Sequence, residues 1–298
     1  MPELPEVEIT RQKLAPLLRG RRILEFWTDW PRGLRAAHGK GKIAKDMRGR
    51  TIVGIERRGK VLFFMLSGKP PRVMAVHLRM SGRLAAVRGE NPNGYNPSRS
   101  YRPVSSRAVM RWTHFRWRLA DGLGLHFVDP RKFGVVWYGS PAALSRDRYL
   151  GRLGVDAAAI SRQDFIARFR SRRGMIKPAL LRQDIVAGIG NVIADESLWR
   201  ARLHPATPAS ALGTGDIASL HRAIRTTIRT ILASGGTSLR TFRHPDGRIG
   251  RYQERRLAYG NAGKPCPRCR TPLMRVVLAS RGTTICPKCQ RRSLQFQT

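Results

Sequence analysis

The stretch CPRCRTPLMRVVLASRGTTICPKC, residues 266–289, decides how the end of this 298-residue chain folds. It holds all four cysteines of the sequence as two C-x2-C pairs, with sixteen residues between the pairs. Thiolate pairs at this spacing are typical of a tetrahedral zinc site, and four sulfur ligands leave no open position for a catalytic water. We therefore predict one structural Zn²⁺, bound by Cys266, Cys269, Cys286 and Cys289.

The residues between the cysteine pairs have the pattern of a β-hairpin. Leu273–Ala279 and Thr283–Ile285 are rich in apolar and β-branched residues, and Arg281 and Gly282 fall near the expected turn. A basic side chain on a rigid hairpin can contact a phosphate group. The alternative for Arg281 is an ordinary solvated residue of the turn.

Upstream of the cysteines, the sequence has helical spacing from about residue 155 onward. Gly188-Ile189-Gly190-Asn191 predicts a tight turn between two of the helices, which is typical of a helix-turn-helix unit. Residues 235–264 are rich in Gly, Arg and Pro and predict a mobile connection. The predicted helices are Gln163–Arg172, Lys177–Gln183, Asn191–Arg200 and Asp216–Ala233.

The first half of the chain has the pattern of a sheet domain. Residues 5–19 predict an amphipathic helix, in which Pro16 favours a kink or an earlier end. Residues 88–107 lack a core pattern and predict a long loop. Short strand-like runs punctuated by Gly and Pro predict a β-sandwich or barrel: Arg22–Trp27, Thr51–Arg57, Val61–Leu66, Val73–Leu78, Phe115–Leu119, Leu125–Val128 and Val135–Tyr138.

The charge of the chain indicates the class of its partner. Lys and Arg number 57 against 19 Asp and Glu, which gives a net charge of +38. Such an excess is self-repelling, and nucleic acid is the polyanion that would neutralise it. A generally arginine-rich proteome is the alternative. No apolar run of about 18 residues predicts a membrane span, and the opening MPELPE lacks the basic start of a secretory signal, so we expect a cytosolic protein.

The N-terminus carries residues that can do chemistry. Removal of Met1 would leave Pro2 as a secondary amine, and the reference pKa of an α-amino group, about 7.7–8.0, leaves a useful fraction unprotonated at neutral pH. Such an amine can attack an electrophilic carbon and form an iminium. Glu3 and Glu6 are close enough in sequence to act as acid and base. On composition alone, these residues are also ordinary ones for an N-terminus.

The opening MPELPEVE, residues 1–8, resembles that of formamidopyrimidine-DNA glycosylase, within the wider family shared with endonuclease VIII. The resemblance covers most of the chain in order. It is carried further by Arg58-Gly59-Lys60, His77–Gly82, Asp129–Gly134, Ile176-Lys177-Pro178, Gly188–Asn191, Asp195–Leu198, Ala258-Tyr259-Gly260, Arg281-Gly282-Thr283 and the cysteine spacing.

The resemblance implies an α+β multidomain fold. Residues 1–150 would form a catalytic β-sandwich flanked by helices. Residues 157–255 would form a helical domain with a helix–two-turn–helix motif and a lesion-capping loop that contains Tyr252. Residues 256–298 would form a zinc-finger β-hairpin. The implied partner is damaged double-stranded DNA, with no membrane association, and we expect a monomer associated with the bacterial nucleoid.

The resemblance also implies a bifunctional DNA glycosylase and AP lyase of base excision repair. Pro2 would form a Schiff base with the sugar, followed by β- and δ-elimination, while Glu3 and Lys60 take part directly and Glu6 supports them. The damaged nucleotide would be flipped out of the stack. Met80, Arg131 and Phe133 would fill the gap, and Lys60, Lys177, Asn191 and Arg281 would contact phosphates.

Three other functions remain to be weighed. Leu4 and the intact Arg131-x-Phe133 pair favour oxidised purines, such as 8-oxoguanine and formamidopyrimidines, over the oxidised pyrimidines of endonuclease VIII types. A non-catalytic zinc-containing DNA-binding protein would share the charge and the zinc, but would have no need of Pro2, Glu3 and Lys60 together. A ribosomal or RNA-binding protein accounts for the charge but not for the N-terminus.

Overall fold

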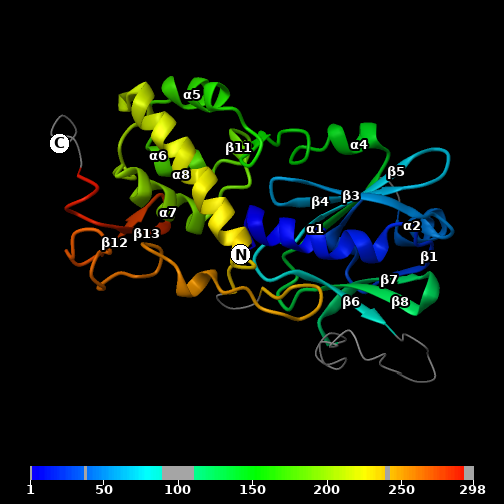
Figure 1. Ribbon diagram of the computed structural model, residues 1–298. Helices are drawn as coiled ribbons and strands as arrows, with labels where there is room; N and C mark the ends of the chain where they lie inside the picture. Colours follow the sequence, from blue (N-terminus) through cyan, green and yellow to red (C-terminus); the bar gives the residue numbers. More distant parts are fainter. Residues whose placement is uncertain (1, 37–38, 89–110, 239–241, 292–298) are drawn as a thin grey trace. The chain divides into compact units, whose positions relative to one another are not determined.

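The computed structural model describes residues 2–36, 39–88, 111–238 and 242–291, which form two compact units (Figure 1). The first unit runs as far as residue 151 and also contains residues 235–251, and the second holds residues 152–234 and the chain from 252 onward. The predicted loop at 88–107 lies outside the described residues except for its first residue. Within the described residues, no helix has the length and apolarity to cross a membrane.

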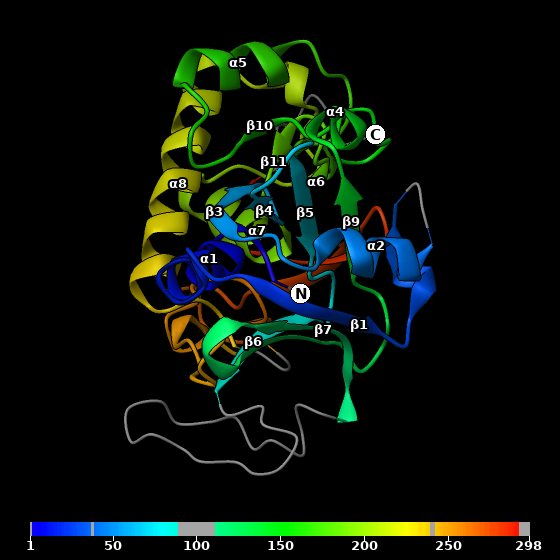
Figure 2. The same ribbon diagram turned by 90° about the vertical axis from the view of Figure 1, so that its right-hand side faces the viewer.

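Two sheets form the first unit and appear as two layers in Figure 2. One has the order β1-β7-β8-β6 with antiparallel pairing throughout: β1 (Ile23–Thr28), β7 (Thr113–Leu119), β8 (Leu123–Val128) and β6 (Arg83–Arg88). The other has the order β2-β9-β5-β4-β3, antiparallel except for β2–β9: β2 (Leu34–Arg35), β9 (Val135–Gly139), β5 (Arg72–His77), β4 (Val61–Leu66) and β3 (Ile52–Arg58). The predicted β-sandwich is confirmed.

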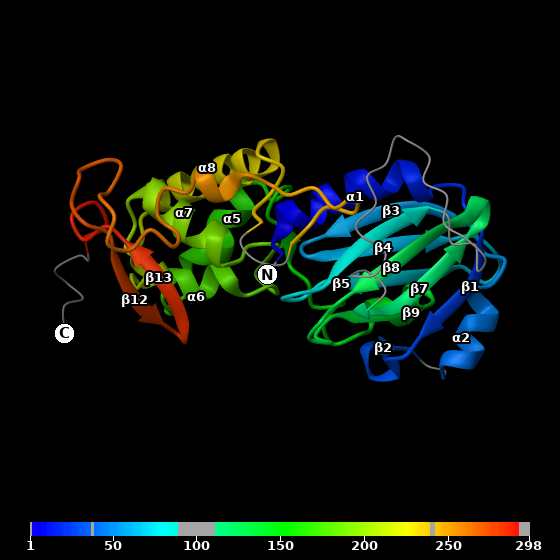
Figure 3. The ribbon, with the colours of Figure 1, turned by 90° about the horizontal axis from the view of Figure 1, so that it is seen from below.

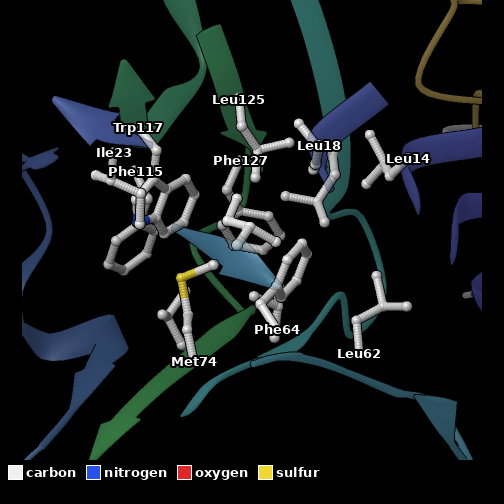
Figure 4. Packing of buried hydrophobic residues seen from close by; sticks show 14 of the residues in the cluster. Leu14, Leu18, Ile23, Leu62, Phe64, Met74, Phe115, Trp117, Leu125 and Phe127 are labelled. Carbon is white, nitrogen blue, oxygen red and sulfur yellow. The ribbon is translucent and has the colours of Figure 1, made fainter. Parts of the chain in front are cut away.

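The core of the sandwich lies between the inner faces of the two sheets. Phe64 and Met74 from one sheet meet Phe115, Trp117 and Phe127 from the other (Figure 4). The rings of Phe115 and Trp117 stack with centroids 6.1 Å apart. Burial of each such side chain contributes on the order of 1.5–3 kcal/mol, so this cluster is a main source of stability for the unit.

Helices α1 (Leu4–Leu18), α2 (Lys40–Met47) and α4 (Pro141–Ser145) flank the sheets. Leu14 and Leu18 of α1 and Met47 of α2 are buried in the same core. Of the two outcomes predicted for Pro16, a kink or an earlier end, the earlier end is wrong, because α1 continues to Leu18. Pro16 stands in the last turn, where the ring removes one internal hydrogen bond but has little helix left to disrupt.

Strand β6 and helix α2 were missed by the sequence prediction for a common reason. Ala85 and Ala86 give β6 a weak intrinsic preference for strand, and pairing along β8 decides its conformation. In α2, Gly41 and the lysines obscure the pattern, although Ile43 and Met47 are buried at i and i+4 spacing. Tertiary burial therefore overrides local preference at both segments.

The second unit is helical and ends in the predicted hairpin, seen in Figure 3 beside α6 and α7. The hairpin turn is formed by Ala279 and Ser280, which both have positive φ, so Arg281 lies on a strand rather than in the turn. The elements are β10 (Val155–Asp156), α5 (Arg162–Arg170), α6 (Ile176–Leu181), β11 (Val186–Ala187), α7 (Asn191–Ala201), α8 (Thr214–Ala233), β12 (Met274–Leu278) and β13 (Arg281–Ile285).

The described residues between 235 and 264 form no long helix or strand. Phe242, Tyr252 and Ala258 are nevertheless buried, each within its own unit. We predicted a mobile connection for this segment. Its described residues instead form irregular chain that is anchored by buried side chains. Composition could not reveal this, because the few apolar residues that anchor the segment are scattered among Gly and Arg.

Candidate active site

The N-terminal residues Pro2, Glu3 and Glu6 are all buried at the start of α1. The backbone amide of Glu3 donates to Glu6 Oε2 at 2.8 Å, and the Glu3 side chain accepts from the backbone amide of Glu6. This reciprocal capping box satisfies amides that the helix leaves unpaired at its first turn. It therefore holds the two carboxyl groups in a defined position beside Pro2.

Glu6 has a second partner far along the chain, because its Oε1 accepts a hydrogen bond from the backbone amide of Thr237 at 2.8 Å. Burial, with a smaller contribution from the nearby charge of Glu3, raises the pKa of Glu6 from 4.5 to about 7, against the opposing effect of the backbone amide hydrogen bonds. Near neutral pH the carboxyl is thus divided between its protonated and ionised forms. A group of this kind can either give or take a proton.

Lys60 follows Gly59 in the turn between β3 and β4, and its side chain is buried. Arg57 fixes this turn against α1, because its Nε forms an ion pair with Glu8 Oε2 at 2.9 Å and its Nη1 donates to the carbonyl of Gly59 at 3.0 Å. Gly59 has a φ of 58°, which favours glycine. The position of Lys60 thus depends on contacts with α1.

His77 is a site residue that the sequence prediction did not single out. It pairs across β4 and β5 with Val61, next to Lys60, and is buried. Burial lowers its pKa to about 3, helped by the charges of Arg79 and Lys60. Its Nδ1 accepts the backbone amide of Arg79 at 2.9 Å, so the neutral ring carries its proton on Nε2 as a hydrogen-bond donor. The sequence feature that could have identified His77 is that it is the single histidine in the segment 77–82.

Met80 and Phe133 are exposed apolar side chains on two neighbouring loops, with 46% and 50% of their surface accessible. The fully buried Asp129 joins the loops. It accepts hydrogen bonds from the Ser81 hydroxyl on one loop and from the backbone amides of Phe133 and Gly134, both at 2.8 Å, on the other. A buried carboxylate with these partners fixes both loops together.

Arg131 shares this arrangement, since its Nε donates to Ser81 Oγ at 3.1 Å. The loops also need their glycines. A Cβ on Gly82 would come within 2.7 Å of the Phe127 ring, and one on Gly134 would come within 2.1 Å. The loops that carry Met80 and Arg131 therefore rest directly on the aromatic core of the sandwich.

In the second unit, Lys177 is buried, with 1% of its side chain exposed. Its Nζ forms an ion pair with Asp195 at 2.6 Å and donates to Thr283 Oγ1 at 2.7 Å and to the Gly282 carbonyl at 3.1 Å. All three of these partners are protein acceptors, and a direct phosphate contact of Lys177 stays a prediction. Burial raises the pKa of Asp195 to about 6, despite the opposing effect of Lys177.

Asn191 is the first residue of α7 rather than its N-cap, which is Gly190. Its Nδ2 donates to the same Gly282 carbonyl at 2.9 Å. Lys177 and Asn191 thus fix the hairpin on α6 and α7, and Arg281, which precedes Gly282, is exposed. An exposed guanidinium on a fixed strand near a helix N-terminus is suited to a phosphate.

The four cysteine sulfurs lie within 4.8 Å of one another, and those of Cys269 and Cys286 are 3.4 Å apart. Tetrahedral zinc with Zn–S bonds of about 2.3 Å requires roughly 3.8 Å between sulfurs, so the cluster fits one structural Zn²⁺. The guanidinium of Arg268, within the first knuckle, lies 4.2 Å from the ring centroid of Trp199 and donates to the Trp199 carbonyl. The zinc module is thereby attached to the end of α7.

Glu196, like His77, is a buried residue that the sequence prediction did not single out. It accepts the backbone amides of Ala258 and Tyr259 at 2.8 and 2.9 Å and the hydroxyl of Tyr252 at 3.0 Å. The Tyr252 ring, expected in the lesion-capping loop, is fully buried by this contact. The signal that could have been used is an acidic residue among the apolar positions of a helix, because a buried carboxylate needs hydrogen-bond donors.

Three family models match successive parts of the chain. Residues 1–136 match the formamidopyrimidine-DNA glycosylase N-terminal domain, residues 153–243 match the formamidopyrimidine-DNA glycosylase H2TH domain, and residues 263–292 match the zinc finger found in FPG and IleRS.

Full-length relatives carry the same name. Formamidopyrimidine-DNA glycosylase of Roseiflexus sp. (strain RS-1) is 38% identical, covering 98% of this chain and all of the relative, and that of Geobacillus kaustophilus is 36% identical over 98% of this chain and all of the relative. A Lactococcus lactis FPG mutant, in a complex with Fapy-dG containing DNA, superposes with a TM-score of 0.82 at 31% identity over 98% of this chain and all of that chain. The chain therefore belongs to the formamidopyrimidine-DNA glycosylase family of DNA-repair enzymes.

Proposed function

We propose that this chain is a bifunctional DNA glycosylase and AP lyase that removes oxidised purines through a Schiff base on Pro2. The observation that carries the proposal is the buried cluster at the start of α1, where Pro2 adjoins Glu3 and Glu3 is held by the capping box with Glu6. A binding protein has no need of a buried acid pair beside its N-terminus, because burial of carboxyl groups is costly.

The first step is extrusion of the damaged nucleotide from the stack. Met80 and Phe133 are apolar and half exposed, as wedges between base pairs must be, and Arg131 can donate to the unpaired base opposite. Lys60, Asn191 and Arg281 would contact phosphates around the flipped nucleotide, and the Nε2–H of His77 is an additional donor beside Lys60. Lys177 would act through Gly282 and Thr283, by holding the hairpin.

The second step is base release. Once Met1 is removed, the lone pair of the Pro2 nitrogen attacks C1′ of the sugar and the bond from C1′ to the base breaks. The base leaves with its bonding electrons and gains a proton, while the Pro2 nitrogen loses its own, so the protons balance. Glu3 then protonates the ring oxygen as the bond from C1′ to O4′ opens. The product is an iminium between Pro2 and C1′.

The third step is strand cleavage. The iminium acidifies the C2′ proton, whose removal forms the C2′–C3′ double bond and expels the 3′ phosphate. A second elimination expels the 5′ phosphate, and water hydrolyses the iminium to regenerate the amine. Glu6, with its pKa of about 7, is suited to supporting these proton transfers, and it also positions the Glu3 backbone.

The substrate assignment is supported by the solved relatives. The Lactococcus lactis proteins were crystallised with Fapy-dG containing DNA and with abasic-site DNA. Another structure of the same protein contains an oxidised pyrimidine, at 30% identity, so oxidised pyrimidines are the second candidate substrate class. The relatives named here are bacterial, and we place the activity in the bacterial cytoplasm, where the chromosome lies.

Borohydride trapping tests the proposal. The Met1-processed chain is incubated with a duplex that carries 8-oxoguanine opposite cytosine, and the covalent protein–DNA adduct is measured. Adduct formation is expected, and it should disappear when Met1 is retained, because the Pro2 nitrogen is then an amide. The retained-Met1 chain is a matched control, since every side chain is unchanged.

The other outcomes separate the alternatives. Trapping only on an oxidised-pyrimidine or abasic duplex would keep the Pro2 chemistry and change the substrate. Binding of every duplex without trapping on any would replace the enzyme with a non-catalytic DNA-binding protein.

A further inference from the structure

A hollow of about 470 Å³ opens on the second unit between the N-terminus of α5 and one face of α8. Four arginines line it, and no acidic residue does so: Arg162, Arg222, Arg225 and Arg229. In the described part of the chain, no carboxylate lies within ion-pair distance of these four guanidiniums. The hollow is therefore strongly positive.

Three of the arginines come from a single helix. Arg222, Arg225 and Arg229 stand at i, i+3 and i+7 of α8, which places them on one face, and all three are exposed. Arg162 faces them as the first residue of α5. The guanidiniums are thus arranged along two turns of a rigid helix rather than scattered over a flexible surface.

Hydrogen bonds from α8 hold the segment before α5, residues 158–160, which forms the other side of the hollow. Arg225 Nη1 donates to the Ala158 carbonyl at 2.5 Å, and His221 Nε2 lies 3.1 Å from the Ile160 carbonyl. Ser161 caps α5, and Asp164 at its third position is the nearby acid, with its carboxylate hydrogen-bonded to the Ser161 hydroxyl. Four guanidiniums outweigh this one exposed carboxylate.

The chemistry of the hollow selects a phosphate over a base. Arginine presents paired donors that match phosphate oxygens, and the N-terminus of α5 adds a partial positive charge. No Phe, Tyr or Trp side chain lines the hollow, and the His221 ring is already held by Phe165 and the Ile160 carbonyl, so a nucleobase would find little stacking surface. In Figure 1, α5 and the β12–β13 hairpin that carries Arg281 lie on opposite sides of this unit.

We propose that this hollow binds the phosphate backbone of a nucleic acid, independently of base damage. The row of guanidiniums on α8 favours several consecutive phosphates over a single ion, and the chain carries a net charge of +38. This contact would add to the phosphate contacts proposed for Arg281 and Asn191. It does not depend on the Schiff-base chemistry.

The test uses the full zinc-loaded chain and a short undamaged duplex. Arginine modification by phenylglyoxal, read residue by residue by mass spectrometry, should slow several-fold at Arg222 and Arg229 when the duplex is added. Inorganic phosphate at matched ionic strength is the second probe. Protection by phosphate alone, and not by duplex, would show an ion site and overturn the nucleic-acid proposal, as would protection by neither.

A pair of variants gives an independent measurement. The double substitution Arg222→Gln and Arg229→Gln should reduce the slope of log affinity against log salt by about 1.8, because each lost phosphate contact removes about 0.9. Arg170→Gln with Arg173→Gln removes the same charge from the last residue of α5 and the segment that follows it, and should leave the slope unchanged. Circular dichroism would check that both double variants are folded. Equal changes of slope in the two would show that only the total charge matters and would overturn the proposal.

Discussion

Glu6 and Thr237 are joined by a hydrogen bond of 2.8 Å from the Thr237 amide to Glu6 Oε1, although 231 positions separate them in the chain. The other oxygen of the same carboxyl accepts the amide of Glu3. One buried carboxyl group thus connects the proposed catalytic turn at Pro2 to the segment that follows α8. The protonation of Glu6 affects both ends of this connection.

The Glu6 carboxyl predicts a specific dependence of stability on pH. Its pKa is about 7 in the folded chain against an ordinary value of 4.5, so the folded chain holds this proton more tightly than the unfolded chain does. The corresponding stability is fully present below pH 4.5 and is lost as pH rises through 7, by about 3 kcal/mol. Urea unfolding of Glu6→Gln should lack this dependence, whereas Glu56→Gln, at an exposed position, should retain it. Parallel pH profiles for the two variants would contradict the assignment.

Met80→Ala and Phe133→Ala should separate activity from stability. Both side chains are about half exposed, so truncation should cost less than about 1 kcal/mol of unfolding free energy. Excision from a lesion-containing duplex should nevertheless slow by at least roughly tenfold, the equivalent of 1.4 kcal/mol, because the gap left by the flipped nucleotide is no longer filled. Val53→Ala, equally exposed on β3, is the control. If both Met80→Ala and Phe133→Ala excised the base as fast as the Val53→Ala control, the wedge role would be wrong.

Asp129→Asn should loosen both wedge loops at once. The amide can accept through one oxygen only, so at least one of the buried donors from Ser81, Phe133 and Gly134 loses its acceptor. A loss of about 1–3 kcal/mol is expected in denaturant unfolding, together with slower excision. Ser81→Ala removes a single donor and should cost less. A cost in Ser81→Ala as large as in Asp129→Asn would show that the two loops are not held through Asp129.

Lys177→Met tests whether this lysine contacts phosphate or only holds the hairpin. Removing one partner of the buried Lys177–Asp195 pair should cost about 3–5 kcal/mol of unfolding free energy. The salt slope of DNA binding, measured on the fraction that remains folded, should be unchanged. Arg281→Gln should lower that slope by about 0.9 without a comparable loss of stability. A slope reduced by Lys177→Met would restore the direct phosphate contact.

Removal of zinc should unfold the hairpin of the zinc module without acting directly on the reaction at Pro2. The cluster of Cys266, Cys269, Cys286 and Cys289 predicts one zinc per chain by elemental analysis. Chelation should unfold the hairpin, because a closed thiolate site supplies folding free energy. DNA affinity should fall with it, while the sandwich melts at its usual temperature. Full DNA affinity in the zinc-free chain would contradict the placement of Arg281 by the metal site.

Elements with strong local patterns could be predicted from the sequence alone. The cysteine spacing determined the zinc module, since ligand type and separation are sufficient for a tetrahedral site. Alternating apolar runs determined the sandwich, and the turn at 188–191 determined the junction of α6 and α7. The resemblance then predicted roles for Pro2, Glu3, Met80 and Phe133, because its motifs are contiguous segments, and of these the structure shows Met80 and Phe133 to be exposed.

The partners of the buried charged groups could not be predicted from the sequence, because folding brings them together. The sequence predicts that Lys177 binds a phosphate, and the structure shows its ammonium buried against Asp195 and the hairpin. Asp129 and Glu196 became central for the same reason, because a carboxylate withdrawn from water must collect donors from distant segments. The partners of such groups come from chain positions far apart, as for Glu6 and Thr237, so no local pattern in the sequence can specify them.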